Sequence, residues 1–267
     1  MNLTRVYAIF IRQFYLIRDN PTRLFQMLVW GTVDIILWGF ISKYLTSVAG
    51  PGFKFTFVFL GAVLIWDFLG RIMQGITMSF MEDSWARNFL NLFASPLSVS
   101  EYMLGLIMTS VFKSVLSFSV LLLVASMIFG FSVTTYGLSI LSFLLILFLS
   151  GIALGILGVS IMLRWGPIAE WFIWPIPALI SPFVGVLYPT SILPQWMQYV
   201  GQFLPPSYVF DGLRTIVAGG EFQTTAFLTG IVLALFYIVL AYIVFLRVYR
   251  RAVRTGLIVR YSAENIS

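Results

Sequence analysis

The sequence predicts an all-α integral membrane protein that forms one transmembrane domain over residues 1–267. Three observations lead to this fold class. Hydrophobic residues make up 60% of the chain and charged residues 10%, whereas about 25% of the residues in a soluble domain are charged. The apolar residues gather into stretches that are long enough to cross a bilayer as helices, which takes about 20 residues each. Basic residues concentrate at the two ends of the chain.

Six apolar stretches have the length of a transmembrane helix. They cover residues 24–44, 55–81, 102–130, 137–163, 168–187 and 226–248. Four of the 16 basic residues precede the first stretch, and five lie from position 247 onwards. Because Lys and Arg are enriched in cytoplasmic segments, we expect both ends of the chain in the cytoplasm, which requires an even number of crossings. Six crossings meet this requirement and leave a basic cytoplasmic tail at 249–267.

The composition excludes most catalytic chemistry. The chain contains no Cys and no His, so thiolate nucleophiles, imidazole bases and the usual transition-metal ligands are missing. The longest segment outside the six stretches, 188–225, is too short for a catalytic domain, and no phosphate-binding GxxxxGK[ST] loop occurs. We therefore expect no catalytic, cofactor or metal site. The distribution of the basic residues indicates the orientation of the chain in the membrane, and we expect no nucleic-acid partner.

Residues 1–23 are predicted to form an amphipathic helix at the cytoplasmic interface. Arg5, Arg12 and Asp19 recur at seven-residue spacing and share one stripe, while apolar residues occupy the opposite side. Asn20 and Pro21 then supply a cap and a first-turn proline for the first span. Two roles stay open for this helix, a membrane anchor and a docking element.

The cytoplasmic segment 82–100 predicts a short helix between the second and third spans. Its sequence, EDSWARNFLNLFASPLSVS, begins with acidic and Ser capping residues and ends at Pro96. Ser98 and Glu101 have the spacing of a capping box that starts the third span. A short aromatic helix facing the cytoplasm suits docking to a soluble subunit. The alternative is a helical connection that packs on its own bundle.

Prolines interrupt the chain from the fifth span onwards. Seven of them lie between positions 175 and 206, and proline breaks regular helix. Two short helices fit between the breaks, at 194–203 and at 206–218, and the second is closed by Gly219 and Gly220. Irregular backbone at membrane depth must be buried in protein or line a cavity. We therefore expect segment 188–225 to form a re-entrant helical hairpin in the outer leaflet.

Ionisable residues inside the predicted spans form an intramembrane polar network. Asp67 and Arg71 are four residues apart and are predicted to pair on one helix face. Lys113 lies deep in the third span, and Asp34 is its expected partner. Such a network either fixes helix register or lines a substrate path or an interface, and a proton relay is the most specific form of this second, functional reading.

Small residues mark one face of the fourth span. Gly151, Gly155 and Gly158 leave this face smooth for close helix packing. Packing within the chain is favoured over dimerisation.

Taken together, these features resemble the permease subunits of type-2 ABC exporters. The resemblance covers the whole chain. It is carried by the six spans with both ends inside, the basic N-terminal helix, the connector WARNFLNLFASPLSVSEY and the stretch YPTSILPQWMQYVGQFLPPSYVFDGLR. Such permeases export polysaccharides, teichoic-acid polymers, lipids or drugs across a bacterial or archaeal cytoplasmic membrane.

The resemblance implies partners and site residues. Two permease subunits pair, as homodimer or heterodimer, among membrane lipids, and two cytoplasmic ATPase subunits bind ATP and Mg beneath them. The helix that couples to the ATPase maps to about 84–93, with Ser84, Trp85, Arg87, Phe89 and Leu92 as contacts. The hairpin would shape an outer gate with Pro194, Trp196, Pro205, Pro206, Tyr208, Asp211 and Arg214.

Two other function classes stay open. An ion-coupled carrier would usually show an internal repeat with matching broken helices, whereas the prolines here cluster only in and after the fifth span. A membrane-embedded lipid-modifying enzyme would need clustered carboxylates at a membrane face. Glu82-Asp83 is the one acidic doublet, and helix capping accounts for it.

Overall fold

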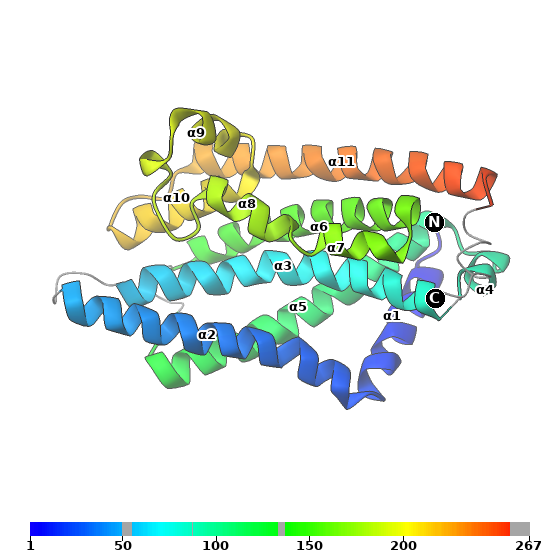
Figure 1. Cartoon of the computed structure of the whole chain (residues 1–267), viewed down its shortest axis with the longest axis horizontal. Helices are drawn as coiled ribbons and strands as arrows, with labels where there is room; N and C mark the ends of the chain where they lie inside the picture. The colour runs from blue at the N-terminus through cyan, green and yellow to red at the C-terminus, as the bar shows by residue number, and fades with distance from the viewer. Residues whose placement is uncertain (50–54, 87, 133–136, 257–267) are drawn as a thin grey trace.

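The computed structural model describes residues 1–49, 55–86, 88–132 and 137–256, and in these ranges every regular element is a helix. Five long helices lie along the longest axis of the molecule (Figure 1). They are α2 (Pro21–Ala49), α3 (Phe55–Trp85), α5 (Val99–Phe129), α6 (Ser139–Trp165) and α11 (Thr224–Arg254). All five are long and apolar enough to cross a membrane. This is an all-helical fold with five candidate membrane-spanning helices, in keeping with the predicted class.

Local signals explain where several helices begin and end. Asn20 accepts a hydrogen bond from Thr22 N at 3.1 Å at the start of α2. The predicted capping box is present at the start of α5, where Ser98 and Glu101 cap one another. Gly130 closes α5 in the left-handed region with a φ of 64°, which glycine adopts without steric cost.

The fifth predicted span, 168–187, is not one continuous helix. It is divided into a 3-10 turn η2 (Pro167–Ala169), α7 (Glu170–Ile173) and α8 (Ile176–Val184). Pro175 and Pro177 explain the division, because neither has an N–H that could continue the hydrogen bonding of α7. Ile173 and Trp174 nevertheless lie against α3 and α6, and α7 and α8 follow the long axis of the bundle (Figure 1).

Helix α3 occupies the centre of the bundle. Its residues Leu60, Leu69, Ile72, Met73 and Ile76 have no solvent exposure. The predicted small-residue face of α6 packs here: a Cβ on Gly151 would lie 2.9 Å from Ile72, and one on Gly155 would lie 2.7 Å from Ile76. The expectation that this face packs within the chain is therefore confirmed.

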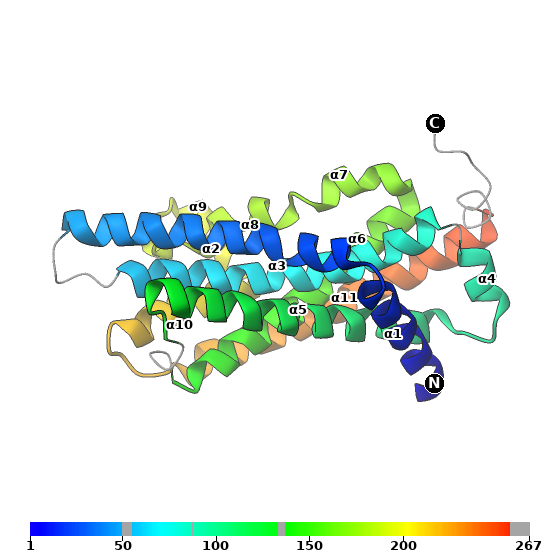
Figure 2. The ribbon, with the colours of Figure 1, turned by 90° about the horizontal axis from the view of Figure 1, so that it is seen from below.

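One end of the bundle gathers α1 (Leu3–Arg18), α4 (Phe89–Ala94) and the last turns of α11 (Figures 1 and 2). The predicted N-terminal helix is confirmed, and its basic stripe is bound to the bundle. Arg12 pairs with Asp83 at 2.6 Å. Arg23, in the first turn of α2, pairs with the neighbouring Glu82 at 3.1 Å. Arg5 lies 3.6 Å from Glu101.

These ion pairs also correct the expected start of the cytoplasmic helix. Glu82 and Asp83 do not cap a new helix, because α3 continues past them to Trp85. Their carboxylates instead bind Arg23 and Arg12, and the short helix α4 begins at Phe89.

The opposite end carries the two predicted short helices. They are α9 (Gln195–Gln202) and α10 (Pro205–Val217), preceded by the 3-10 turn η3 (Thr190–Ile192). The expected boundaries of both helices are confirmed to within a residue or so. They lie at the end of the bundle away from α1 and α4 (Figure 1).

We expect Gly155→Ala to lower the free energy of unfolding by about 1–3 kcal/mol, the usual cost of an overpacked core. The added methyl group would press on Ile76. Gly70→Ala is the matched control on α3, because a Cβ there meets nothing within 4 Å. Unfolding in mixed micelles measures both variants, and equal losses would contradict the tight α3–α6 contact.

Candidate functional site

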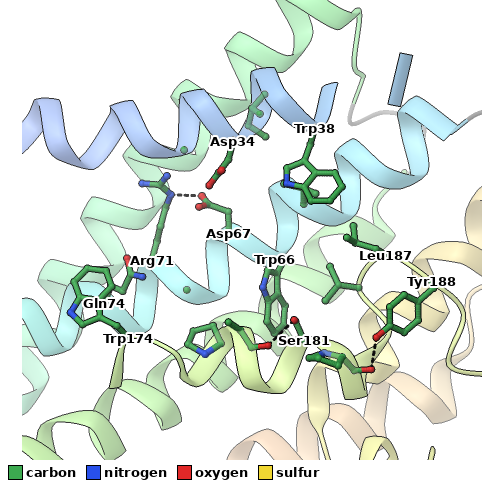
Figure 3. Close-up of a pocket in the computed structure, with 18 residues that line it drawn as sticks. Asp34, Trp38, Trp66, Asp67, Arg71, Gln74, Trp174, Ser181, Leu187 and Tyr188 are labelled. Atoms are coloured by element: carbon green, nitrogen blue, oxygen red, sulfur yellow. Dashed lines mark hydrogen bonds and ion pairs between the residues drawn. The ribbon is translucent and has the colours of Figure 1, made fainter. Parts of the chain in front are cut away.

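A polar cluster lies halfway along the bundle on the face of α3 that is turned towards α2. Asp67 and Arg71 form the ion pair expected from their spacing, and Gln74 lies one turn further along the same face. Asp34 projects from α2 towards this pair (Figure 3). The pair of Asp67 and Arg71 is therefore confirmed, and it stands where α2 and α3 face one another.

A glycine on α2 allows the Arg71 guanidinium to reach this position. A Cβ at Gly31 would clash with the Nη2 atom of Arg71, and it would lie 2.9 Å from Leu121 on α5. Any larger residue at position 31 would therefore displace the guanidinium or push α2 away from the bundle.

The expected pair of Asp34 and Lys113 is wrong. Lys113 Nζ donates to Ser79 Oγ at 3.3 Å, and among the described residues Asp34 takes part in no ion pair. Helix register is the reason. Asp34 lies level with Asp67, whereas Ser79 is twelve residues further along α3, about 18 Å at 1.5 Å per residue.

A cavity of about 550 Å³ extends from the polar cluster towards the end that carries α9 and α10. It is called the outer cavity after the orientation expected from the sequence, and its counterpart at the other end is called the inner cavity. Helices α2 and α3 form one side of the outer cavity and α8 forms the other (Figure 3). Its charged lining residues are Asp34, Asp67 and Arg71. The remaining lining is largely aromatic and aliphatic, with residues that include Trp38, Val63, Trp66, Trp174, Pro177, Ala178, Leu187 and Tyr188.

An inner cavity of about 520 Å³ extends from the same cluster towards the end that carries α1. The ion pair of Arg23 with Glu82 lines it, and so does Lys113. Ser114 and Ser117 also line it, and their buried hydroxyl groups have no hydrogen-bond partner in the part of the chain that the structure describes. The two cavities share Gly31, Asp34, Asp67, Arg71, Gln74 and Trp174. The polar cluster thus belongs to the wall of both cavities, which extend towards opposite ends of the bundle.

The residues expected to contact an ATPase have different surroundings. Ser84 and Trp85 belong to the last turn of α3, where Ser84 is buried and Trp85 is 47% exposed. Phe89 is only 2% exposed and packs on Phe80, with ring centroids 4.9 Å apart. Leu92 is half-buried against the core. Arg87 lies outside the described residues.

The residues of the expected outer gate hold the α8–α10 region together. Arg214 donates to the carbonyl oxygens of Gly185 and Tyr188 and pairs with Asp211 at 3.1 Å. The Tyr208 hydroxyl donates to Gln202 O at 2.8 Å. Pro205 and Pro206 are buried in the first turn of α10, whereas Pro194 and Trp196 are exposed.

Sequence reasoning missed the aromatic wall of the outer cavity. Trp38 follows Asp34 by one helical turn, and Trp66 directly precedes Asp67. The i,i+4 spacing on α2 could have placed Trp38 beside Asp34. Trp174 had no such signal, because its position depends on the break between α7 and α8.

Two comparisons of the sequence with known proteins find no match. No protein-family model matches the chain, and no curated protein sequence matches it either. Among the described residues, no group of three or more Asp or Glu side chains is placed to hold a metal ion. The function must therefore be argued from the two cavities and the cluster between them.

Asp67→Asn is expected to lower the free energy of unfolding by about 1–3 kcal/mol, because it removes the carboxylate that forms an ion pair with the half-buried Arg71 guanidinium. The control is Asp19→Asn, which removes a carboxylate from the exposed pair with Arg18 and should change stability by less than about 1 kcal/mol. Thermal unfolding in detergent measures both. If Asp67→Asn were as mild as its control, the pair would not stabilise the bundle.

Proposed function

We propose that this protein is the membrane-spanning permease subunit of an ATP-driven exporter, with the ATPase on a separate chain. The proposed substrate path runs between α2, α3, α5 and the α7–α8 segment. One observation carries the proposal: two cavities of similar size point to opposite ends of the bundle and meet at a polar cluster. A path across the membrane requires cavities that extend towards both ends and share part of their wall near the middle.

The course of the chain supports six crossings in this proposal. Helix α6 ends and α9 begins at opposite ends of the molecule (Figure 1), so the α7–α8 segment has to cover the length between them. It lines the cavities rather than facing only lipid, since Trp174 and Pro177 belong to the outer cavity. Irregular backbone at membrane depth is tolerated in that position. Both chain ends would then lie in the cytoplasm.

The cytoplasmic end offers a surface for the ATPase in this proposal. Trp85 is exposed at the end of α3, next to the short helix α4, where Asn91 and Ala94 are also exposed. Phe89 would act from behind this surface, because it anchors α4 to α3 and α5. ATP and Mg would bind to the partner. Exposed apolar residues on α2, α5 and α11 leave room for lipids and for a second permease subunit.

The outer end would serve as the gate. Arg214 on α10 binds the backbone of the Gly185–Tyr188 turn, so α8 and the hairpin would move together. The turn also borders the outer cavity through Leu187 and Tyr188. A re-entrant position in the outer leaflet suits the exposed aromatic residues Trp196, Tyr199 and Phe203.

An ion-coupled carrier is the second candidate. The observation that favours it is Asp34, a carboxylate that faces Asp67 without an ion pair among the described residues. Intramembrane carboxylates often carry protons or cations in such transporters.

The energy source separates the two candidates. The protein is co-expressed with soluble ATPases encoded near its gene, and any complex that forms is reconstituted into vesicles. Export that needs ATP and continues after ionophores collapse the ion gradients supports the permease. Transport without any ATPase that stops with ionophores supports the carrier and refutes the permease.

Trp85→Ala is expected to weaken ATPase binding at least tenfold while leaving the fold intact, because it truncates an exposed side chain. Trp171→Ala is the matched control, since Trp171 is 80% exposed but lies on α7. Phe89→Ala should instead reduce thermal stability, because it empties a buried contact. Pull-down with the ATPase and a melting curve measure both properties. Unchanged ATPase binding by the Trp85 variant would contradict the docking surface.

A further inference from the structure

We propose that the outer cavity binds a lipophilic organic cation, and that Asp34 is the residue that recognises its charge. The inference rests on the proposed function, because it names the substrate class for the same path. Cation binding to this site does not require ATP, so the site can be tested by itself.

The charge of the cavity selects a cation. Among the described residues its charged lining consists of Asp34, Asp67 and Arg71, which together carry one negative charge. Asp67 and Arg71 neutralise one another as an ion pair. Asp34 therefore carries the remaining negative charge. It lies on the cavity side of α2 and points towards the ion pair (Figure 3). An anionic ligand would meet this carboxylate, whereas a cation would compensate it.

The aromatic residues around the carboxylate strengthen this selection. Trp38 from α2, Trp66 from α3 and Trp174 from the break between α7 and α8 all line the cavity (Figure 3). The face of an indole ring attracts cations more strongly than that of any other aromatic side chain. Three indoles from three separate segments therefore surround a site whose free charge is negative.

The polar groups of the wall favour a cation with an apolar body over a sugar. A sugar needs many hydrogen-bond partners, yet two hydroxyl groups of the lining are already used: Ser181 donates to Ala178 O at 2.9 Å and Tyr188 donates to Pro182 O at 2.9 Å. Much of the remaining wall is Val, Ile, Leu, Pro and Ala. The volume of about 550 Å³ suits a drug-sized molecule.

Gly70 opens the wall of this cavity. A Cβ at this position would meet nothing within 4 Å, although the residue lies on the central helix α3. A side chain at position 70 would therefore start in open space at the wall of the cavity, and a large one is expected to occupy part of it. This offers a way to block the site that changes no charge.

The test compares two ions of the same shape and opposite charge, tetraphenylphosphonium and tetraphenylborate. Equilibrium dialysis against the purified full-length protein in a nonionic detergent measures binding, with empty micelles as the blank. We expect the cation to bind at least tenfold more tightly than the anion. Asp34→Asn should weaken cation binding at least tenfold, and Gly70→Leu should abolish it. Asp19→Asn, which removes an exposed carboxylate far from the cavity, should leave it unchanged.

Three results would overturn the proposal: equal binding of the two ions, full cation binding by Asp34→Asn, or full cation binding by Gly70→Leu. A melting curve of each variant shows that it is folded. Asp34→Asn is expected to fold normally, because Asp34 is exposed and has no ion pair among the described residues. If no cation binds but the ATPase still docks through Trp85, the proposed substrate class is refuted and the proposed permease function is supported. If the cation binds but no ATPase docks, the permease function is refuted and the cation site is supported.

Discussion

The close packing of α3 on the glycine face of α6 is the contact on which the rest of the structure depends. Gly151 and Gly155 let the two backbones approach until Ile72 and Ile76 fill the space between them. The opposite face of α3 is thereby turned away from the core, and it carries Asp67, Arg71 and Gln74. One helix thus supplies both the centre of the bundle and the polar cluster. The charges at this depth are tolerated because Asp67 and Arg71 pair with one another on the face that lines the cavities, away from the apolar contact with α6.

Sequence reasoning succeeded where the physics is local. The capping box of Ser98 and Glu101, the short helices α9 and α10, and the pair of Asp67 with Arg71 all depend on residues within four positions of one another. It failed where distant segments meet. The level of Lys113 relative to Asp34, and the inward position of Phe89, are set by how α2, α4 and α5 pack on α3. No spacing along the chain encodes that register.

The proline-broken segment shows how an irregular stretch can be stable among apolar helices. Pro175 and Pro177 prevent a continuous helix, yet Ile173 on one side of the break packs into the groove beside Gly158. Trp174, at the break itself, belongs to the wall of both cavities. The break that prevents a continuous helix therefore also places Trp174 in the wall of both cavities.

The opening at Gly70 also bears on how such a protein can change over evolutionary time. Some residues that line the outer cavity, such as Trp38 and Gly70, lie apart from the tight α3–α6 contact made by Gly155 and Ile76. Exchanging a residue such as Gly70 would alter the shape of the wall while the α3–α6 contact stays as it is. Gly31 and Asp67 instead belong both to the wall and to contacts that hold α2 and α3 in place. Over evolutionary time the shape of the cavity could therefore change at positions of the first kind without loss of stability.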